Sequence, residues 1–169
     1  MSTQRVCAVA VAILTGCMEF SAFETDVDDD ERDQTARNLH ALSQRVAPSG
    51  EFRIAVLSDS HQFYQELCAL ADVLNARDDL SFVMHLGDMA QAGLRQEFRW
   101  TLTCLQQLDI PFLTAAGNHD LISNGAHVYR AMFGDYEYRF DFANTRFVVL
   151  NGNYVEVERP IDDLAWLRT

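Results

Sequence analysis

Lysine is absent from the sequence. All 13 basic residues among the 169 are arginines, against 25 acidic residues, which leaves a formal net charge of −12. A protein that binds nucleic acid through its phosphate backbone needs a basic face. The charge balance therefore argues against nucleic-acid binding, and no such partner is expected. It does not exclude a small phosphorylated substrate, because bound divalent cations can reverse the local field.

Paired cysteine motifs are lacking as well. The four cysteines show neither CxxC spacing nor a pattern typical of a disulfide framework, which argues against a zinc knuckle and against disulfide staples. Cys68 and Cys104 fall within helical patterns. We therefore expect both to be small, buried core residues.

Long hydrophobic runs are missing, but the N-terminus carries a short one. Arg5 precedes an uncharged run from Val6 to Thr15, which is too short to span a bilayer and is typical of a secretory signal. The Leu-Thr-Gly-Cys run that ends at Cys17 resembles a bacterial lipobox, in which cleavage precedes acylation of the cysteine. The sequence thus predicts a signal peptide over residues 1–16 and a lipid anchor at Cys17, with export to the bacterial cell envelope, facing the periplasm or the exterior. The alternative is a buried helix or strand that happens to contain Gly-Cys.

Acidic residues dominate the next stretch. Seven of the ten residues from Glu24 to Asp33 are acidic, so we expect residues 17–50 to form a solvated, extended tether. A calcium loop is the alternative, but an EF-hand needs glycine at its sixth position and glutamate at its twelfth, where this run has Glu31 and Arg37. A short helix is predicted within the segment, from about residue 35 to 46.

The remaining residues, 51–169, read as one α/β domain. Strands are predicted over residues 52–57, 81–86 and 111–116, with amphipathic helices between them. This βαβαβ pattern makes a parallel sheet with right-handed crossovers. The alternating segments 136–142 and 146–151 predict a β-hairpin, and a further helix is expected to begin at Asp162.

Each of the three predicted parallel strands is followed by polar residues of metal-binding type. They are Asp59 and His61 after the first strand, Asp88 after the second, and Asn118 and His119 after the third. Because ligands collect at the carboxyl ends of the strands in open α/β sheets, we expect these residues to meet in space. Carboxylate, imidazole and amide donors without a thiolate suit manganese, iron or zinc.

The segments that carry these residues resemble the calcineurin-like metallophosphoesterase family, from about residue 51 to 166. The family's three motifs are matched by Asp59-Ser60-His61, Gly87-Asp88 and Gly117-Asn118-His119-Asp120. Residues 129–134, 147–151 and 164–167 also resemble members that are exported from bacteria. The resemblance implies an αββα sandwich, of which this chain would be the N-terminal half: the parallel βαβαβ unit followed by the hairpin.

The same resemblance implies a two-metal hydrolase. Asp59 and His61 would bind the first metal ion, Asp88 would bridge both ions, and Asn118 would bind the second. His119 would stabilise the phosphoryl group and protonate the leaving oxygen. A metal-activated hydroxide would hydrolyse a phosphate mono- or diester between the two ions.

One part of the family's pattern is missing. The family completes its site with a further histidine and a Gly-His-x-His element, and no histidine follows His127 here. The second metal site is expected to be incomplete and the activity of this chain alone weak or absent, as for a piece of a longer protein or a shortened gene product. The alternatives are a catalytically incomplete binding or scaffold lipoprotein with this fold and a cytoplasmic Rossmann-type domain. The missing G-x-G-x-x-G after the first strand argues against the latter.

Three further polar residues receive structural interpretations. His85 lies inside the second predicted strand, where a satisfied core histidine is expected. His127 is expected on a surface loop. Asp120 either orients its neighbour or caps the next turn, and it is not included in the predicted site.

Overall fold

The computed structural model describes residues 21, 23–46, 49–153 and 155. The predicted signal peptide, its acylated Cys17 and the helix expected from Asp162 lie outside these residues. Within the described part of the chain, no helix has the length and apolar character needed to cross a membrane.

A three-stranded parallel sheet forms the centre of the fold. Its strands are β1 (Arg53–Leu57), β2 (Leu80–His85) and β3 (Phe112–Thr114), which lie side by side in chain order. The crossovers are α2 (Tyr64–Asn75) and α3 (Arg95–Leu105). The predicted βαβαβ unit is confirmed.

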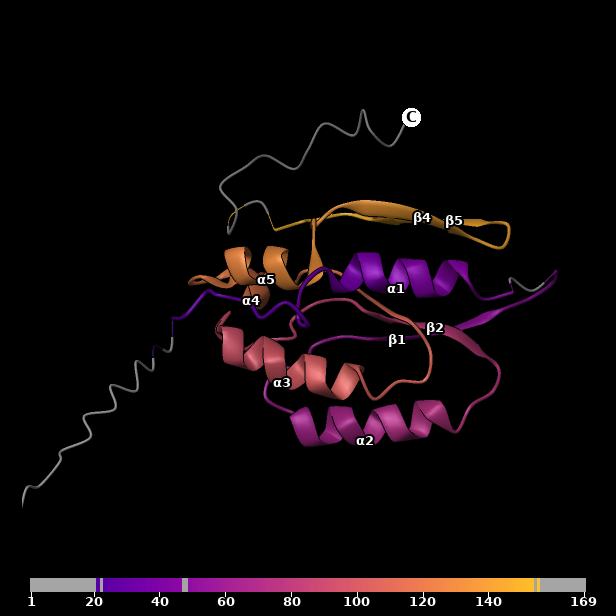
Figure 1. Cartoon of the computed structure of the whole chain (residues 1–169), viewed down its shortest axis with the longest axis horizontal. Helices are drawn as coiled ribbons and strands as arrows, with labels where there is room; N and C mark the ends of the chain where they lie inside the picture. The colour runs from indigo at the N-terminus through magenta and orange to yellow at the C-terminus, as the bar shows by residue number, and fades with distance from the viewer. Residues whose placement is uncertain (1–20, 22, 47–48, 154, 156–169) are drawn as a thin grey trace, which may run out of the picture.

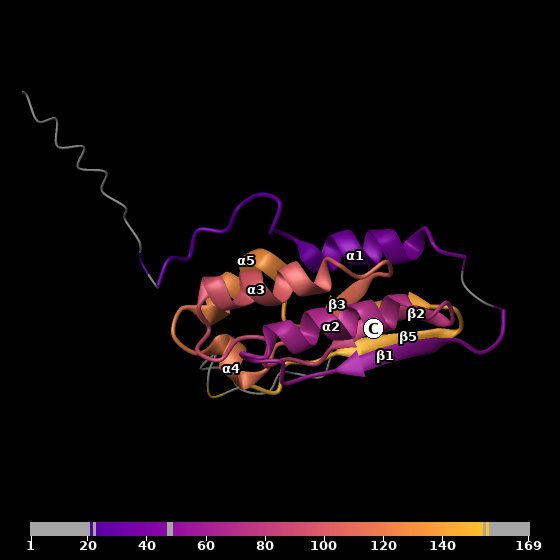
Figure 2. The same ribbon diagram turned by 90° about the horizontal axis from the view of Figure 1, so that it is seen from below.

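The hairpin and the crossover helices cover opposite faces of this sheet (Figure 1, Figure 2). The hairpin consists of β4 (Tyr138–Phe142) and β5 (Thr145–Val149), which pair antiparallel as predicted. Three further helices are α1 (Gln34–Ser43), α4 (Asn118–Leu121) and α5 (Gly125–Phe133). α1 corresponds to the short helix predicted near residues 35–46.

The alternation of side chains along β2 creates two hydrophobic cores. Phe82 and Met84 pack beneath the hairpin, against Phe142 and Val149. Val83 points to the other face, into the core that α2, α3 and α5 cover. Successive strand residues point to opposite faces, so a strand covered on both sides must be apolar nearly throughout. The two covered faces leave the ends of the strands as the place where polar side chains can gather.

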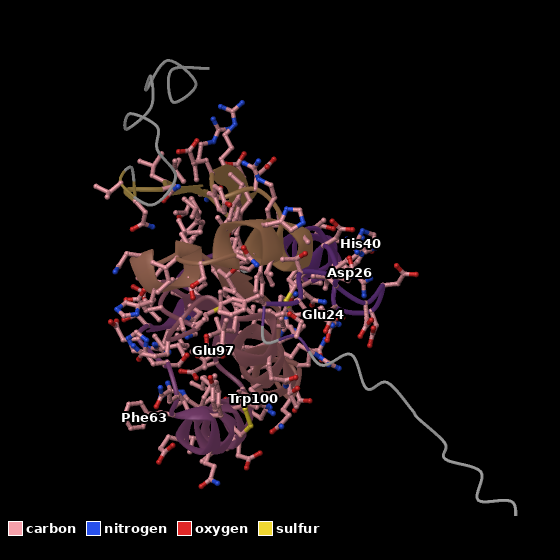
Figure 3. All side chains as sticks on the ribbon, turned by 90° about the vertical axis from the view of Figure 1, so that its left-hand side faces the viewer. Glu24, Asp26, His40, Phe63, Glu97 and Trp100 are labelled. Carbon is pink, nitrogen blue, oxygen red and sulfur yellow. A yellow bond between two sulfur atoms is a disulfide. The ribbon has the colours of Figure 1, made fainter. Side chains whose placement is uncertain are left out.

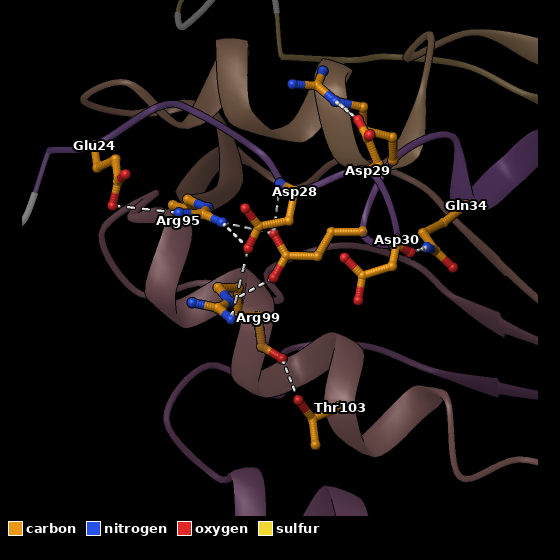
Figure 4. Close-up of polar contacts among 10 residues, drawn as sticks. Glu24, Asp28, Asp29, Asp30, Gln34, Arg95, Arg99 and Thr103 are labelled. Carbon is orange, nitrogen blue, oxygen red and sulfur yellow. Dashed lines mark hydrogen bonds and ion pairs between the residues drawn. The ribbon is translucent and has the colours of Figure 1, made fainter.

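The acidic segment that precedes α1 is not a solvated tether over the residues described. Arg95 and Arg99 of α3 form ion pairs with its carboxylates, which are Glu24, Asp28 and Glu31 (Figure 4). The Arg95–Glu31 pair is 3.0 Å long, with side chains only 9% and 10% exposed. Val27 is buried in the core. The prediction fails for residues 23–33 because two arginines distant in sequence neutralise charges that would otherwise repel one another.

A disulfide joins the two crossover helices. Cys68 of α2 and Cys104 of α3 have Cα atoms 4.5 Å apart and are 36 residues apart in the sequence. Cys104 is buried and Cys68 is half-buried, so the expected burial holds only in part. The prediction that these cysteines form no disulfide is wrong, because the packing of α2 on α3, which sequence spacing does not reveal, brings them together.

Candidate metal centre

Three of the predicted ligands lie together at the carboxyl end of the sheet. One ligand atom each from Asp59, His61 and Asp88 lies within 4.8 Å of the other two. His61 Nε2 is 4.0 Å from Asp59 Oδ1 and 4.0 Å from Asp88 Oδ2. These separations are too long for hydrogen bonds. Because metal–ligand distances are about 2.0 to 2.2 Å, neighbouring ligand atoms on one ion lie roughly 3 to 4 Å apart, so the trio is spaced for a cation.

All three residues adopt a left-handed backbone conformation. Their φ values are 55°, 40° and 54° for Asp59, His61 and Asp88, and only six non-glycine residues of the described chain have a positive φ. Such a conformation costs about 1 to 3 kcal/mol and persists where neighbouring structure enforces it. Here the Asp59 N–H donates to Gly87 O and the His61 N–H donates to Asp88 O, both at 3.0 Å. The loops after β1 and β2 therefore hold each other in the strained form that gathers the three side chains.

The imidazole of His61 is oriented by the main chain. Its Nδ1 lies 3.2 Å from the carbonyl oxygen of Ala90. A carbonyl only accepts hydrogen bonds, so this network assigns the proton to Nδ1 and leaves a lone pair on Nε2. Nε2 is the atom that faces the two carboxylates. A neutral imidazole whose other nitrogen donates to a fixed acceptor is the usual form of a histidine metal ligand.

The third motif packs directly against the second. A Cβ atom placed on Gly117 would lie closer than 3.0 Å to three atoms of Asp88: the main-chain nitrogen, Cγ and Oδ1. The His119 N–H donates to Asp88 Oδ1 at 3.0 Å. Asn118, between Gly117 and His119 in the sequence, is the first residue of α4 and is exposed. The fold thus brings Asn118 to the same end of the sheet as the trio.

His119 contacts the ring of His61. The rings of His61 and His119 meet edge to face, with centroids 4.9 Å apart. His119 Nδ1 lies 2.8 Å from the carbonyl oxygen of Gln91, and the side-chain nitrogen of Gln91 is farther, at 3.4 Å. The shorter contact assigns the proton to Nδ1, which leaves Nε2 of the half-buried ring free to exchange a proton at the site.

Asp120 joins the second and third motifs. The carboxylate is fully buried, and it accepts hydrogen bonds from the N–H groups of Ala90 at 2.8 Å and Gly117 at 2.9 Å. Burial raises the pKa of Asp120 to about 7, although these hydrogen bonds oppose the shift. The capping interpretation holds for α4, and Asp120 also fixes the loop at Ala90, whereas its orienting role toward His119 stays a prediction. An acidic residue three positions after a helix-starting glycine is the signal that could have revealed this role.

His85 is a core residue, as predicted. It is fully buried, its Nε2 lies 2.9 Å from Ser60 Oγ, and its Nδ1 accepts from the Gly87 N–H at 3.3 Å. Burial lowers the pKa of His85 to about 4, so the ring is neutral at physiological pH. Through these two contacts it supports the first two motifs, and it is not one of the three clustered residues. His127 is exposed on α5 rather than on a loop.

A family model described as calcineurin-like phosphoesterase matches residues 52–168. Among curated proteins, none matches the chain. Among solved structures, a purple acid phosphatase from yellow lupin (Lupinus luteus) seeds is similar, with 15% sequence identity and a TM-score of 0.45. That match covers 66% of this chain and 27% of the lupin chain, so the chain spans little more than a quarter of that protein's length.

Proposed function

Because the chain belongs to the calcineurin-like phosphoesterase family, we propose that its domain, residues 51–169, serves in metal-dependent hydrolysis of a phosphate mono- or diester. The observation that carries this proposal is the trio of Asp59, His61 and Asp88, which faces one point with ligand atoms within 4.8 Å. Strained backbone at all three residues supports it, since such strain clusters at functional sites.

The donor set fits the divalent cations that the family implies. Two carboxylates and one imidazole, without a thiolate, suit manganese, iron or zinc. In this proposal Asp59 and His61 hold the first of two cations, Asp88 is shared between them, and Asn118 holds the second. When bound, such cations lower the pKa of a coordinated water and neutralise charge on phosphoryl oxygens.

His119 is the residue proposed to move a proton. Its Nδ1 is occupied by the carbonyl of Gln91, and its Nε2 is free. In the protonated ring, Nε2–H can donate to a phosphoryl oxygen and then release its proton to the leaving oxygen. The edge-to-face contact with His61 fixes the ring beside the cation site.

Calorimetric titration with Mn²⁺ tests the metal site. Asp88→Asn should bind Mn²⁺ at least about 10-fold more weakly than wild type, because the shared ligand is lost. Asp72→Asn, a change at an exposed carboxylate on α2, is the matched control and should bind normally. Equal affinity in wild type and Asp88→Asn would refute the site.

Hydrolysis of an activated phosphodiester tests the reaction. The proposal predicts that wild type turns over this substrate in the presence of Mn²⁺. His119→Ala should reduce that turnover by about 100-fold or more. Metal binding by Asp59, His61 and Asp88 without any turnover would instead favour the binding or scaffold lipoprotein.

We also propose that the protein is exported and acylated at Cys17, after cleavage of residues 1–16. The disulfide between Cys68 and Cys104 supports export, because disulfides persist in oxidising compartments. In a bacterial host, wild type and Cys7→Ser should incorporate labelled fatty acid and partition with membranes. Cys17→Ser should do neither, and labelling of that variant would contradict the proposal.

A further inference from the structure

We infer that Glu97 is a positioning residue for both histidines of the proposed site, and that it acts through one loop of main chain. The loop comprises residues 89–94, between the second motif and α3, and is called here the orienting loop. This inference rests on the proposed function, because it assigns the histidines their metal-binding and proton-transferring roles.

Two consecutive carbonyl groups of the orienting loop set the two imidazoles. Ala90 O lies 3.2 Å from His61 Nδ1, and Gln91 O lies 2.8 Å from His119 Nδ1. The two ring orientations are therefore not independent. A shift of this one loop changes the acceptors of both histidines together.

The orienting loop is held by a buried carboxylate from the helix that follows it. One oxygen of Glu97, Oε2, accepts from the Ala92 N–H at 2.9 Å and from the Leu94 N–H at 3.0 Å. Glu97 is only 8% exposed, and Figure 3 labels it among the other side chains. Hydrogen bonds from main-chain N–H groups to a carboxylate are stronger than neutral ones. Without Glu97, the N–H groups of Ala92 and Leu94 would lose this acceptor, and the Ala92 N–H belongs to the same peptide unit as the Gln91 carbonyl that holds His119.

Other groups hold the start of the same loop. Thr101 of α3 donates to Met89 O at 3.0 Å, and Asp120 accepts from the Ala90 N–H. Asp120 also caps α4 through Gly117, so a change there would disturb the third motif directly. Glu97 holds the second half of the loop and, through the Leu94 N–H, also caps α3, but it does not contact the third motif, so a change at Glu97 reaches the histidines through the loop.

Nitrogen-15 NMR of the histidine rings in the metal-free full chain provides the first test. At a pH where the imidazoles are neutral, His61 and His119 should both carry their proton on Nδ1. His85 should carry its proton on Nε2, because its Nδ1 accepts from Gly87. Either site histidine with its proton fixed on Nε2 in wild type would overturn the inference.

Variants provide the second test. Glu97→Leu should lose the Nδ1–H signals of both site histidines and bind Mn²⁺ about 10- to 100-fold more weakly, while the His85 signal is retained. Glu97→Gln should retain most of the Nδ1–H signals and most of the Mn²⁺ affinity, because its amide oxygen can accept hydrogen bonds from the N–H groups of Ala92 and Leu94. Glu66→Gln, at an exposed position on α2, is the matched control for the lost charge and should behave as wild type.

Three outcomes of the variant test would also overturn the inference. The first is a Glu97→Leu variant with unchanged histidine signals and unchanged Mn²⁺ affinity. The second is loss of the His85 signal together with the other two, which would assign Glu97 to overall folding. The third is failure of Glu97→Gln to restore either readout. The ring signals need neither metal nor substrate, so they are independent of the outcome for the proposed reaction.

Discussion

Gly117→Ala should weaken metal binding although alanine is compatible with the backbone at this position. Gly117 has a φ of −88°, which any residue adopts. The added Cβ would nevertheless lie closer than 3.0 Å to the main-chain nitrogen, Cγ and Oδ1 of Asp88. The main chain of Asp88 is held by the first motif, because its carbonyl accepts the His61 N–H. The clash must therefore be relieved by moving the Asp88 carboxylate or by separating the two loops.

The size of that movement sets the expected effect. Ordinary contacts of a Cβ atom are 3.4–4 Å long, so relief requires a displacement on the order of 1 Å. Overpacking of this kind typically costs about 1 to 3 kcal/mol of stability. Metal–ligand distances tolerate only about 0.2 Å, so a carboxylate displaced this far no longer coordinates well. Mn²⁺ affinity should fall by at least about 10-fold.

Gly134→Ala separates the two effects. Gly134 has a φ of 104°, and an added Cβ would meet nothing within 4 Å. This variant should lose a similar amount of stability, about 1 to 3 kcal/mol, through backbone strain alone and should bind Mn²⁺ as wild type does. Urea denaturation measures the stabilities and calorimetric titration the affinities. A Gly117→Ala variant that binds Mn²⁺ with wild-type affinity would refute the assignment of Asp88 as a ligand.

Three further predictions concern the rest of the fold. Burial lowers the pKa of His85 from 6.5 to about 4, so the unfolded state binds more protons between these values. The stability contribution of this ring, present above pH 6.5, should therefore be lost as the pH falls through 4. At about 1.4 kcal/mol per pH unit the loss is roughly 3 kcal/mol. The free energy of unfolding, measured by urea denaturation at several pH values in this range, should depend less steeply on pH in His85→Gln than in wild type. Reduction of the Cys68–Cys104 disulfide should lower stability by about 2 to 4 kcal/mol, measured by thermal unfolding with and without reductant. In a variant with alanine at both positions, the reductant should not change the stability. Arg95→Leu removes one of the two arginines that pair with the buried Glu31, and because Arg99 remains, the cost in urea denaturation should be about 1.5 to 3 kcal/mol, whereas Arg130→Leu, from an exposed pair, should cost less than about 1.

The parts of the fold that sequence could predict depend on local pattern. β2 is mostly apolar because both its faces are covered, and Asp88 lies three residues after its last residue, so one short run predicts a buried strand and a polar residue just beyond its end. β1 is only partly buried, with Arg53 and Val56 exposed, but its apolar run is likewise followed by Asp59 and His61. Parallel order then places these strand ends at one edge of the sheet, which explains why the trio was found without knowledge of any contact.

The parts that sequence could not predict depend on contacts between distant segments. The acidic residues near Asp28 read as a solvated run because their partner, Arg95, lies 67 positions away. Cys68 and Cys104 read as ordinary core residues for the same reason. The role of Glu97 is hidden in the sequence because the residue at the start of its helix is Leu94, so the usual capping-box signature with serine or threonine is absent.

The acceptors that orient both histidines are main-chain atoms, and this fact shapes how the orienting loop responds to mutation. A different side chain at Gln91 leaves the carbonyl in place, so an alanine scan would rank this position as dispensable. Deletion or insertion of one residue between Ala90 and Leu94 would instead shift both carbonyls against both rings. The loop is therefore constrained in its length more than in its composition, because its backbone path places the two carbonyls.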